Sequence, residues 1–119
     1  MPERRQLKRY PAHVPVWCEA DDFTLYVHTA NVSRDGLFVR TSHPLPLNTP
    51  FTVVFKELET VAAVRVSWIR HGVGASQSGM GLEITGFERG ENSYLRFIRE
   101  QDTHGAEMPA PARDPETFD

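Results

Sequence analysis

The sequence predicts an all-β protein, a small six-stranded antiparallel β-barrel followed by one short α-helix. Three observations predict this fold. Short segments in which apolar and polar residues alternate follow one another between turn-forming residues, which is typical of strands. No helical pattern of about 10–15 residues separates these segments, and this argues against a parallel α/β sheet. Only near the C-terminus does the apolar spacing change to that of a helix.

The first two predicted strands show the alternation most clearly. In HVPVWCEA, residues 13–20, the apolar side includes Cys18, and Pro15 places the segment at a sheet edge or at a strand start. In FTLYVHTANVS, residues 23–33, one face carries Phe23, Leu25 and Val27. Both segments are therefore expected to bury one face.

Four further strands complete the predicted barrel. They are GLFVRTS, FTVVFKEL, VAAVRVSWIRH and MGLEIT, residues 36–42, 51–58, 61–71 and 80–85. The loop HPLPLNTP before the second of these contains three prolines and cannot lie inside a sheet. HGVGASQSG, rich in glycine and serine, predicts a turn before the last strand. Closing the sheet into a barrel removes its exposed edges.

The helix is predicted within ERGENSYLRFIREQD, where Tyr94, Leu95 and Ile98 share one side and Asn92 or Ser93 is the expected N-cap. From about Gly105 the composition of proline, alanine and acidic residues predicts a disordered tail. The expected organisation is therefore a basic N-terminal arm, the barrel with its helix, and an acidic tail. These parts cover residues 1–12, 13–100 and 101–119.

Composition indicates a single globular domain with an uneven charge distribution. Residues 1–99 carry 12 Lys and Arg against 10 Asp and Glu, whereas residues 100–119 carry one Arg against six acidic residues. The net charge of −3 therefore hides a slightly basic folded part. No apolar run approaches the roughly 20 residues of a membrane span, and no signal peptide is visible. A single cysteine, Cys18, favours a reducing compartment, and we expect a cytoplasmic protein.

Residues that could perform catalysis or hold a metal are scattered. The five histidines show no metal-ligand spacing, so no metal site is predicted. Cys18 lies on an apolar strand face, where a buried structural role is favoured over a nucleophile. Adjacent carboxylates fall in predicted turns, where solvation accounts for them. The sequence therefore indicates no enzyme and no cofactor.

Two motifs remain as candidates for ligand binding. Arg5 and Arg9 form R-x-x-x-R in the basic arm, and residues 31–36, NVSRDG, form N-x-S-x-x-G between two predicted strands. Arginine side chains bind phosphates and guanine edges and stack on bases. Asn and Ser favour turns, and Gly36 allows positive φ or a close approach. Taken separately, the first motif also fits a solvated arm and the second a purely structural turn.

Together, in this order and on a small barrel with a trailing helix, the two motifs resemble the PilZ domain, a family that binds the bacterial second messenger cyclic di-GMP. The similarity covers roughly residues 3–100. ERRQLKRYPAHVPV is similar to the segment that leads into the family's first strand, and VRVSWIRHG with GMGLEITGF to its last two strands. The resemblance implies a stand-alone cyclic di-GMP receptor that relays its signal through a change in the arm to an unidentified protein partner, in motility or exopolysaccharide regulation.

The resemblance also implies which residues bind the nucleotide. Arg5 and Arg9 match the arginines that hold guanine bases and phosphates. The second motif and the GMGLEI strand supply Asn31, Ser33, Gly36 and Gly81, with Arg34 and Asp35 as possible additional contacts. Arg4, just before the first motif, resembles the residue found in members that bind an intercalated pair of cyclic di-GMP molecules.

Two other functions stay open from the sequence. One is a PilZ-like interaction adaptor that binds no nucleotide, which the retained arginines argue against. The other is a barrel for single-stranded nucleic acid with Trp17, Phe38 and Trp68 as stacking platforms. A net charge of only +2 on the folded part disfavours nucleic acid as a partner. A monomer or weak homodimer is expected, with no insertion into a membrane.

Overall fold

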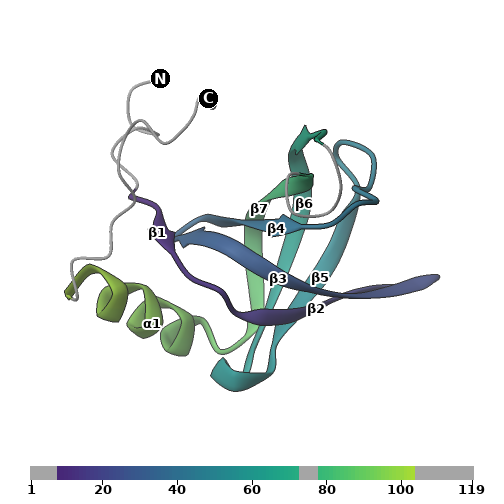
Figure 1. Cartoon of the computed structure of the whole chain (residues 1–119). Coiled ribbons are helices and arrows are strands. Elements are labelled where there is room, and N and C mark those ends of the chain that lie inside the picture. Colours follow the sequence, from purple (N-terminus) through teal and green to yellow (C-terminus); the bar gives the residue numbers. More distant parts are fainter. Residues whose placement is uncertain (1–7, 73–77, 104–119) are drawn as a thin grey trace.

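The computed structural model describes residues 8–72 and 78–103. Within them the chain forms strands, one short 3-10 helix and one α-helix (Figure 1). The strands are β1 (Tyr10–Pro11), β2 (Pro15–Ala20), β3 (Phe23–Ser33), β4 (Gly36–Arg40), β5 (Pro50–Phe55), β6 (Thr60–Arg70) and β7 (Gly79–Arg89). The 3-10 helix η2 spans Lys56–Leu58, and the helix α1 spans Glu91–Thr103.

Six strands close into the antiparallel barrel that the sequence predicted. Their order is β3-β2-β5-β6-β7-β4, and β4 pairs back with β3. The additional strand β1 pairs with the end of β3, where Tyr10 is opposite Val32. Part of the segment expected to be a separate arm therefore belongs to the sheet. α1 packs at one end of the barrel and contacts β1, β6 and η2 (Figure 1).

The core fills the barrel with side chains from every long strand and closes against α1. Tyr94 of α1 is fully buried and packs on Phe55 and Phe87, with ring centroids 5.3 and 5.6 Å apart. Cys18 is fully buried, as its place on the apolar face predicted. The largest fully buried apolar side chains are Tyr94, Phe55, Leu37, Met80, Val16, Val32, Val39, Val53, Val64 and Val66.

The strands begin and end where local sequence requires it. Pro15 and Pro50 are the first residues of β2 and β5, positions at which the missing N–H costs no ladder hydrogen bond. The segment expected to be a strand to residue 58 leaves the sheet at Phe55 and turns through η2. β7 is longer than the predicted 80–85 and runs to Arg89.

The ends of α1 differ from the prediction. The helix begins at Glu91, so Asn92 and Ser93 lie in its first turn and the prediction that one of them caps it is wrong. Gly90, with φ of 81°, precedes the helix, and its carbonyl accepts a hydrogen bond from the Tyr94 amide at 3.0 Å. The helix continues to Thr103, past the boundary expected at residue 100. The predicted disordered tail otherwise lies outside the described residues.

Candidate functional site

A β-bulge in β3 determines which side chains of the second motif face outward. Thr29 is opposite Val39 and Asn31 is opposite Phe38, so Ala30 is an extra residue on β3. A bulge reverses the alternation of the strand beyond it. Val32 consequently enters the core, and Asn31 lies on the outer face.

Arg9 and Asn31 join the two sequence motifs. The Arg9 Nη1 atom donates a hydrogen bond to Asn31 Oδ1 at 2.7 Å, across 22 residues of sequence. The pairing of β1 with β3 places Pro11 opposite Asn31 and so brings Arg9 to the end of this strand. The buried Thr29 fixes the segment between β1 and β2. Its hydroxyl accepts a hydrogen bond from the Val14 amide and donates one to the Ala12 carbonyl.

The turn between β3 and β4 is held by its own residues. The Ser33 hydroxyl lies 3.0 Å from Asp35 Oδ1 and 3.3 Å from the Gly36 carbonyl oxygen. A Cβ on Gly36 would lie 2.6 Å from the Leu82 carbonyl oxygen, so only glycine lets β4 approach β7 here. Ser33 and Gly36 are both buried, whereas Asp35 is exposed. Ser33 and Gly36 therefore both have a structural role in this turn.

Tyr94 of α1 forms hydrogen bonds to the same turn, a role that the sequence did not predict. Its hydroxyl donates to the Ser33 carbonyl oxygen at 2.6 Å and lies 3.4 Å from that of Gly36. Burial raises the pKa of Tyr94 above its ordinary value, the Asp35 carboxylate adds to the rise, and Arg9 opposes it. The helix is thus hydrogen-bonded to the turn that carries the second motif.

Four outward-facing residues form a row across the barrel, which we call the site row: Asn31, Phe38, Gly81 and Trp68. Each is opposite the next on strands β3, β4, β7 and β6. Phe38 and Trp68 stack nearly parallel, with centroids 5.0 Å apart and an interplanar angle of 17°. The Arg70 guanidinium lies 5.2 Å from the Phe38 ring centroid. Trp68 keeps 37% of its surface exposed, whereas Phe38 keeps only 4%, so the aromatic face that the row presents to solvent belongs to Trp68. The prediction that Phe38 is a surface stacking platform is wrong, because Phe38 is covered by its neighbours.

Gly81 lies directly beneath the indole of Trp68. A Cβ at this position would collide with the indole ring, so the absence of a side chain at Gly81 allows Trp68 to lie against the barrel. The sequence expectation was that Gly81 lets a ligand approach the barrel, and a ligand at this point meets Trp68 first. Residues Trp68 and Arg70 therefore extend the set inferred from the motifs.

The other predicted residues are distributed as follows. Arg34 is exposed and lines a hollow of about 260 Å³ between β1 and α1, together with Tyr10 and Asp102. Its side chain thus belongs to the helix side of the turn rather than to the site row. Arg4 and Arg5 lie outside the described residues.

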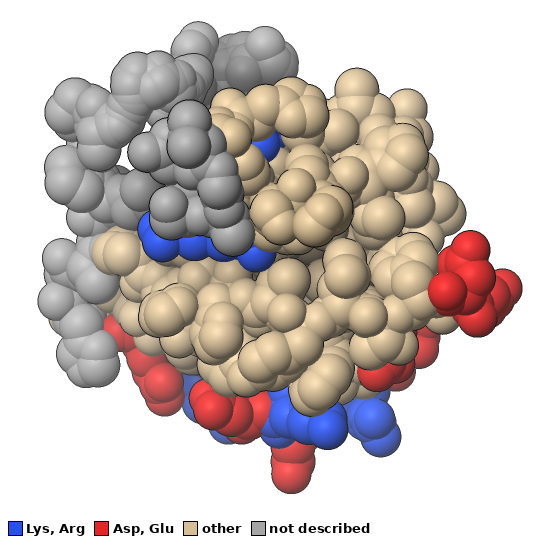
Figure 2. All heavy atoms as spheres, turned by 45° about the vertical axis from the view of Figure 1, so that its right-hand side comes forward, with Lys and Arg blue, Asp and Glu red and all other residues tan. Residues whose placement is uncertain are grey.

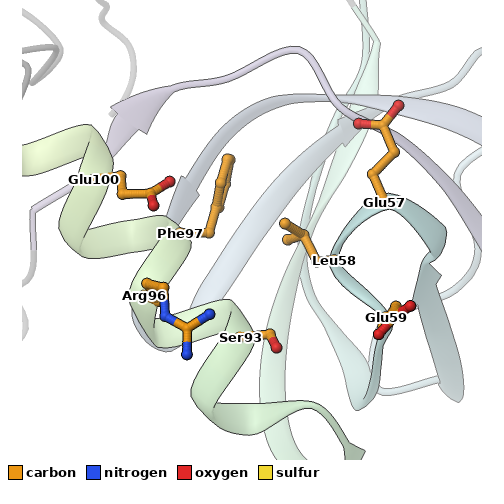
Figure 3. A pocket seen from close by; sticks show the side chains of 7 residues that line it. All are labelled: Glu57, Leu58, Glu59, Ser93, Arg96, Phe97 and Glu100. Carbon is orange, nitrogen blue, oxygen red and sulfur yellow. The ribbon is translucent and has the colours of Figure 1, made fainter.

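A second hollow, of about 240 Å³, lies on the opposite flank of α1, between the helix and η2 (Figure 3). Leu58 and Phe97 face each other across it in Figure 3. The glutamates 57, 59 and 100 line it as well, with a single arginine, Arg96. Figure 2 shows charged side chains of both signs along the lower edge of the molecule, at the height of α1 and η2 in Figure 1. The three glutamates that line this hollow do not suit a phosphate ligand, and none of the predicted site residues lines it.

A different aromatic cluster lies on β2, on β3 and on the segment just before β2; we call it the aromatic ladder: His13, His28, Tyr26 and Trp17. Successive ring centroids are 4.7, 5.4 and 4.6 Å apart, and every pair is tilted rather than parallel. The Lys56 ammonium lies 5.1 Å from the Trp17 ring centroid. Tyr26 is 52% exposed.

Other classes of site find no support in the part of the chain described. No three His, Cys, Asp or Glu side chains in residues 8–72 and 78–103 are grouped to hold a metal ion. Burial raises the pKa of the Cys18 thiol to about 12, which keeps it protonated and unreactive. Among the described helices, none has the length and apolar character needed to cross a membrane.

Comparison with known proteins agrees with this geometry. A search of curated protein sequences finds no match. The structure of the Bacillus subtilis inhibitor of motility (MotI/DgrA) is similar with a TM-score of 0.69 at 17% identity, over 85% of this chain and 52% of the other. This chain thus spans about half the length of that protein. The PilZ domain of Escherichia coli YcgR, solved with c-di-GMP, gives a TM-score of 0.55 at 20% identity, over 86% and 94% of the two chains.

The likeness to these two structures establishes the barrel with its C-terminal helix as a shared fold. The sequence itself matches the family model of the PilZ domain over residues 3–101, nearly the whole described region. The motif spacing, the closed barrel and this match agree, and the chain belongs to the PilZ domain family.

Proposed function

We propose that this protein is a cytoplasmic receptor for cyclic di-GMP, and not an enzyme, that binds the nucleotide between the R-x-x-x-R arm and the N-x-S-x-x-G turn. The observation that carries the proposal is the hydrogen bond of 2.7 Å from Arg9 to Asn31, because it joins one residue of each motif. The PilZ domain of YcgR, which has the same fold, was solved with cyclic di-GMP, and this supports the same ligand class here.

The chemistry of the residues suits a guanine nucleotide with phosphates. A guanidinium carries five N–H donors, so Arg9 can contact Asn31 and still donate to a phosphate or a guanine edge. The Asn31 amide can pair with the polar edge of a base. Trp68, stacked on Phe38 at the other end of the site row, offers a flat face for a second ring of the ligand.

The signal is proposed to pass through the arm to a protein partner. β1 comprises only two residues, so few ladder hydrogen bonds join Tyr10 and Pro11 to β3. A ligand that engages Arg5 and Arg9 changes the surface that the arm presents. MotI, which shares the fold, is an inhibitor of motility, and this makes motility a reasonable output to test alongside exopolysaccharide regulation.

Calorimetric titration with cyclic di-GMP of the wild type and of Arg9→Ala tests the proposal. Charge-assisted hydrogen bonds contribute roughly 1.5–3 kcal/mol each, so the variant is expected to bind about tenfold to a hundredfold more weakly. Lys56→Ala is the matched control, because it removes an equal charge from the aromatic ladder and is expected to leave affinity unchanged. Binding of the wild type should also weaken with added salt.

Equal affinity of Arg9→Ala and the wild type contradicts the assignment of Arg9. Absence of heat with cyclic di-GMP, together with binding of a single-stranded oligonucleotide, favours the nucleic-acid function instead. The partly exposed ladder beside Lys56 would then be the stacking platform to test by Trp17→Ala.

The number of nucleotides bound is a separate prediction. Arg4 adds a further guanidinium beside the first motif, and we expect saturation at two cyclic di-GMP molecules per protomer. Arg4→Ala is expected to lower this number to one while retaining binding through Arg5 and Arg9. Saturation of the wild type at one molecule per protomer contradicts the role of Arg4.

A further inference from the structure

Helix α1 is connected to both halves of the candidate site, each time through a tyrosine hydroxyl. The Tyr94 hydroxyl donates to the Ser33 carbonyl at 2.6 Å and so holds the turn. The Tyr10 hydroxyl donates to Asp102 Oδ1 at 3.1 Å and so fixes Tyr10, the residue after Arg9, to α1. Asp102 also pairs with Lys8, on the other side of Arg9, at 3.8 Å. One helix thus contacts the chain on both sides of Arg9 as well as the turn.

We propose that α1 sets the distance between the arm and the turn, and that Tyr94 and Tyr10 are positioning residues for the nucleotide. The inference rests on the proposed function for its ligand, and on the hydrogen bonds alone for its mechanics. A ligand that contacts two parts of the protein binds more tightly when those two parts are already fixed before binding. Loosening either hydroxyl contact therefore raises the ordering cost that the ligand has to meet.

Burial makes the Tyr94 contact the stronger of the two. Its side chain is fully buried, and its two acceptors belong to the buried residues Ser33 and Gly36. A buried carbonyl that loses its donor has no solvent to replace it. Tyr10 is 5% exposed, but its acceptor Asp102 is about half exposed, so water replaces part of that bond.

The variants Tyr94→Phe and Tyr10→Phe test the proposal with the least disturbance. Each retains the ring, and neither changes the charge of the site, so long-range attraction to phosphates stays the same. The matched control is Ile98→Val, which removes one buried methyl group from the same helix but none of the hydrogen bonds to the turn or the arm. Ile98 lines the same hollow as Tyr10 and Arg34, so this control separates a change in packing from the loss of a hydroxyl. It is expected to lower stability by an amount similar to the loss of one hydroxyl.

The first measurement is the affinity for cyclic di-GMP by calorimetry. Each tyrosine variant is expected to bind about threefold to tenfold more weakly, which corresponds to the net free energy of one hydrogen bond. The double variant is expected to show the product of the two factors, since the two hydroxyls hold different halves of the site. Ile98→Val should bind like the wild type.

The second measurement is amide hydrogen exchange without any nucleotide. The Ile84 amide donates to the Asp35 carbonyl at 2.8 Å and reports on the turn, and the Ala12 amide donates to that of Ala30 at 3.4 Å and reports on the arm. Tyr94→Phe should accelerate exchange at Ile84, and Tyr10→Phe at Ala12, each by about threefold to tenfold. Ile98→Val should accelerate neither of them selectively.

The outcomes separate the two proposals. If the wild type binds and the tyrosine variants bind as tightly as Ile98→Val, the positioning role is wrong while the receptor function stands. If the wild type does not bind cyclic di-GMP, the receptor function is wrong, and the exchange data alone decide whether α1 fixes the arm and the turn. Unchanged exchange at Ile84 and Ala12 overturns the inference in either case.

Discussion

The site row and the aromatic ladder share strand β3, carry two or more aromatic rings each, and have a cation close to one ring. They differ in what lies beneath the rings and in how the rings are oriented. In the site row, Gly81 allows Trp68 to lie against the barrel, and the ring is nearly parallel to Phe38 at 17°. In the ladder, the rings of Trp17 and Tyr26 are tilted by 47°.

From this difference we expect that exposed aromatic rings alone do not make a nucleotide site. A base stacks on a flat face, and its phosphates need cationic donors at a fixed distance from that face. The site row ends at Asn31, which Arg9 contacts, and so combines both requirements. The ladder has rings tilted against one another and the Lys56 ammonium near Trp17.

The largest effect expected from this comparison follows the removal of one tryptophan from each surface. Stacking of a base on an aromatic side chain is worth roughly 1–3 kcal/mol, so Trp68→Ala is expected to weaken cyclic di-GMP binding about tenfold. Trp17→Ala, the matched variant on the ladder, is expected to leave affinity unchanged. Calorimetry with both variants checks this, and an equal loss in both would remove the distinction between the two surfaces.

A smaller effect is expected from Gly81→Ala. The added methyl group pushes the indole of Trp68 away from the barrel, which Trp68 can tolerate because part of it is exposed. Binding should weaken about fivefold, less than on complete removal of the ring.

A double-variant cycle with Trp68→Ala shows whether Gly81 acts on the ligand directly. If the glycine acts only by seating the indole, Gly81→Ala has no further effect on affinity once Trp68 is absent. A further loss in the double variant would instead support the approach of the ligand to Gly81 itself.

Much of the fold could be predicted because alternation and turn residues are local signals. The six barrel strands, the loop with three prolines and the terminal helix all follow from spacing within short segments. The strand β1 was missed, since two residues are too few to show a period. Gly90 was not expected to precede the helix, because Asn92 and Ser93 are the more typical capping residues.

The site could be predicted only as far as its motifs reach. Neighbours across the sheet depend on register, and bulges at Ala30 and between Val66 and Trp68 change that register in ways the alternation does not reveal. Phe38 and Trp68 were predicted as surface aromatic candidates, which holds for Trp68 but not for Phe38, and their stacking and their alignment with Asn31 could not be predicted. Tyr94 was predicted as a core residue, and nothing in its spacing indicated the hydrogen bond to the turn.

The smallest expected effect is on the pH dependence of stability and concerns Cys18. Its side chain is buried in the core on the side of β2 opposite the ladder. Burial raises the pKa of this thiol from an ordinary 9.0 to about 12, so the folded state binds its proton more tightly than the unfolded state. The stability that this provides is complete below pH 9 and is lost as the pH rises toward 12. Between pH 8 and pH 9.5 the free energy of unfolding should therefore fall, by an amount on the order of 1 kcal/mol.

Urea unfolding of the wild type and of Cys18→Ala at the two pH values measures this contribution. The variant creates a small cavity, but that cost is the same at both pH values and cancels in the difference. Most of the decrease between pH 8 and pH 9.5 should therefore disappear in Cys18→Ala. An undiminished decrease would assign it to other groups, and would mean that the interior beneath the ladder admits enough solvent for the folded thiol to titrate near its ordinary pKa. The ladder would then differ from the site row in the packing beneath it as well as in the orientation of its rings.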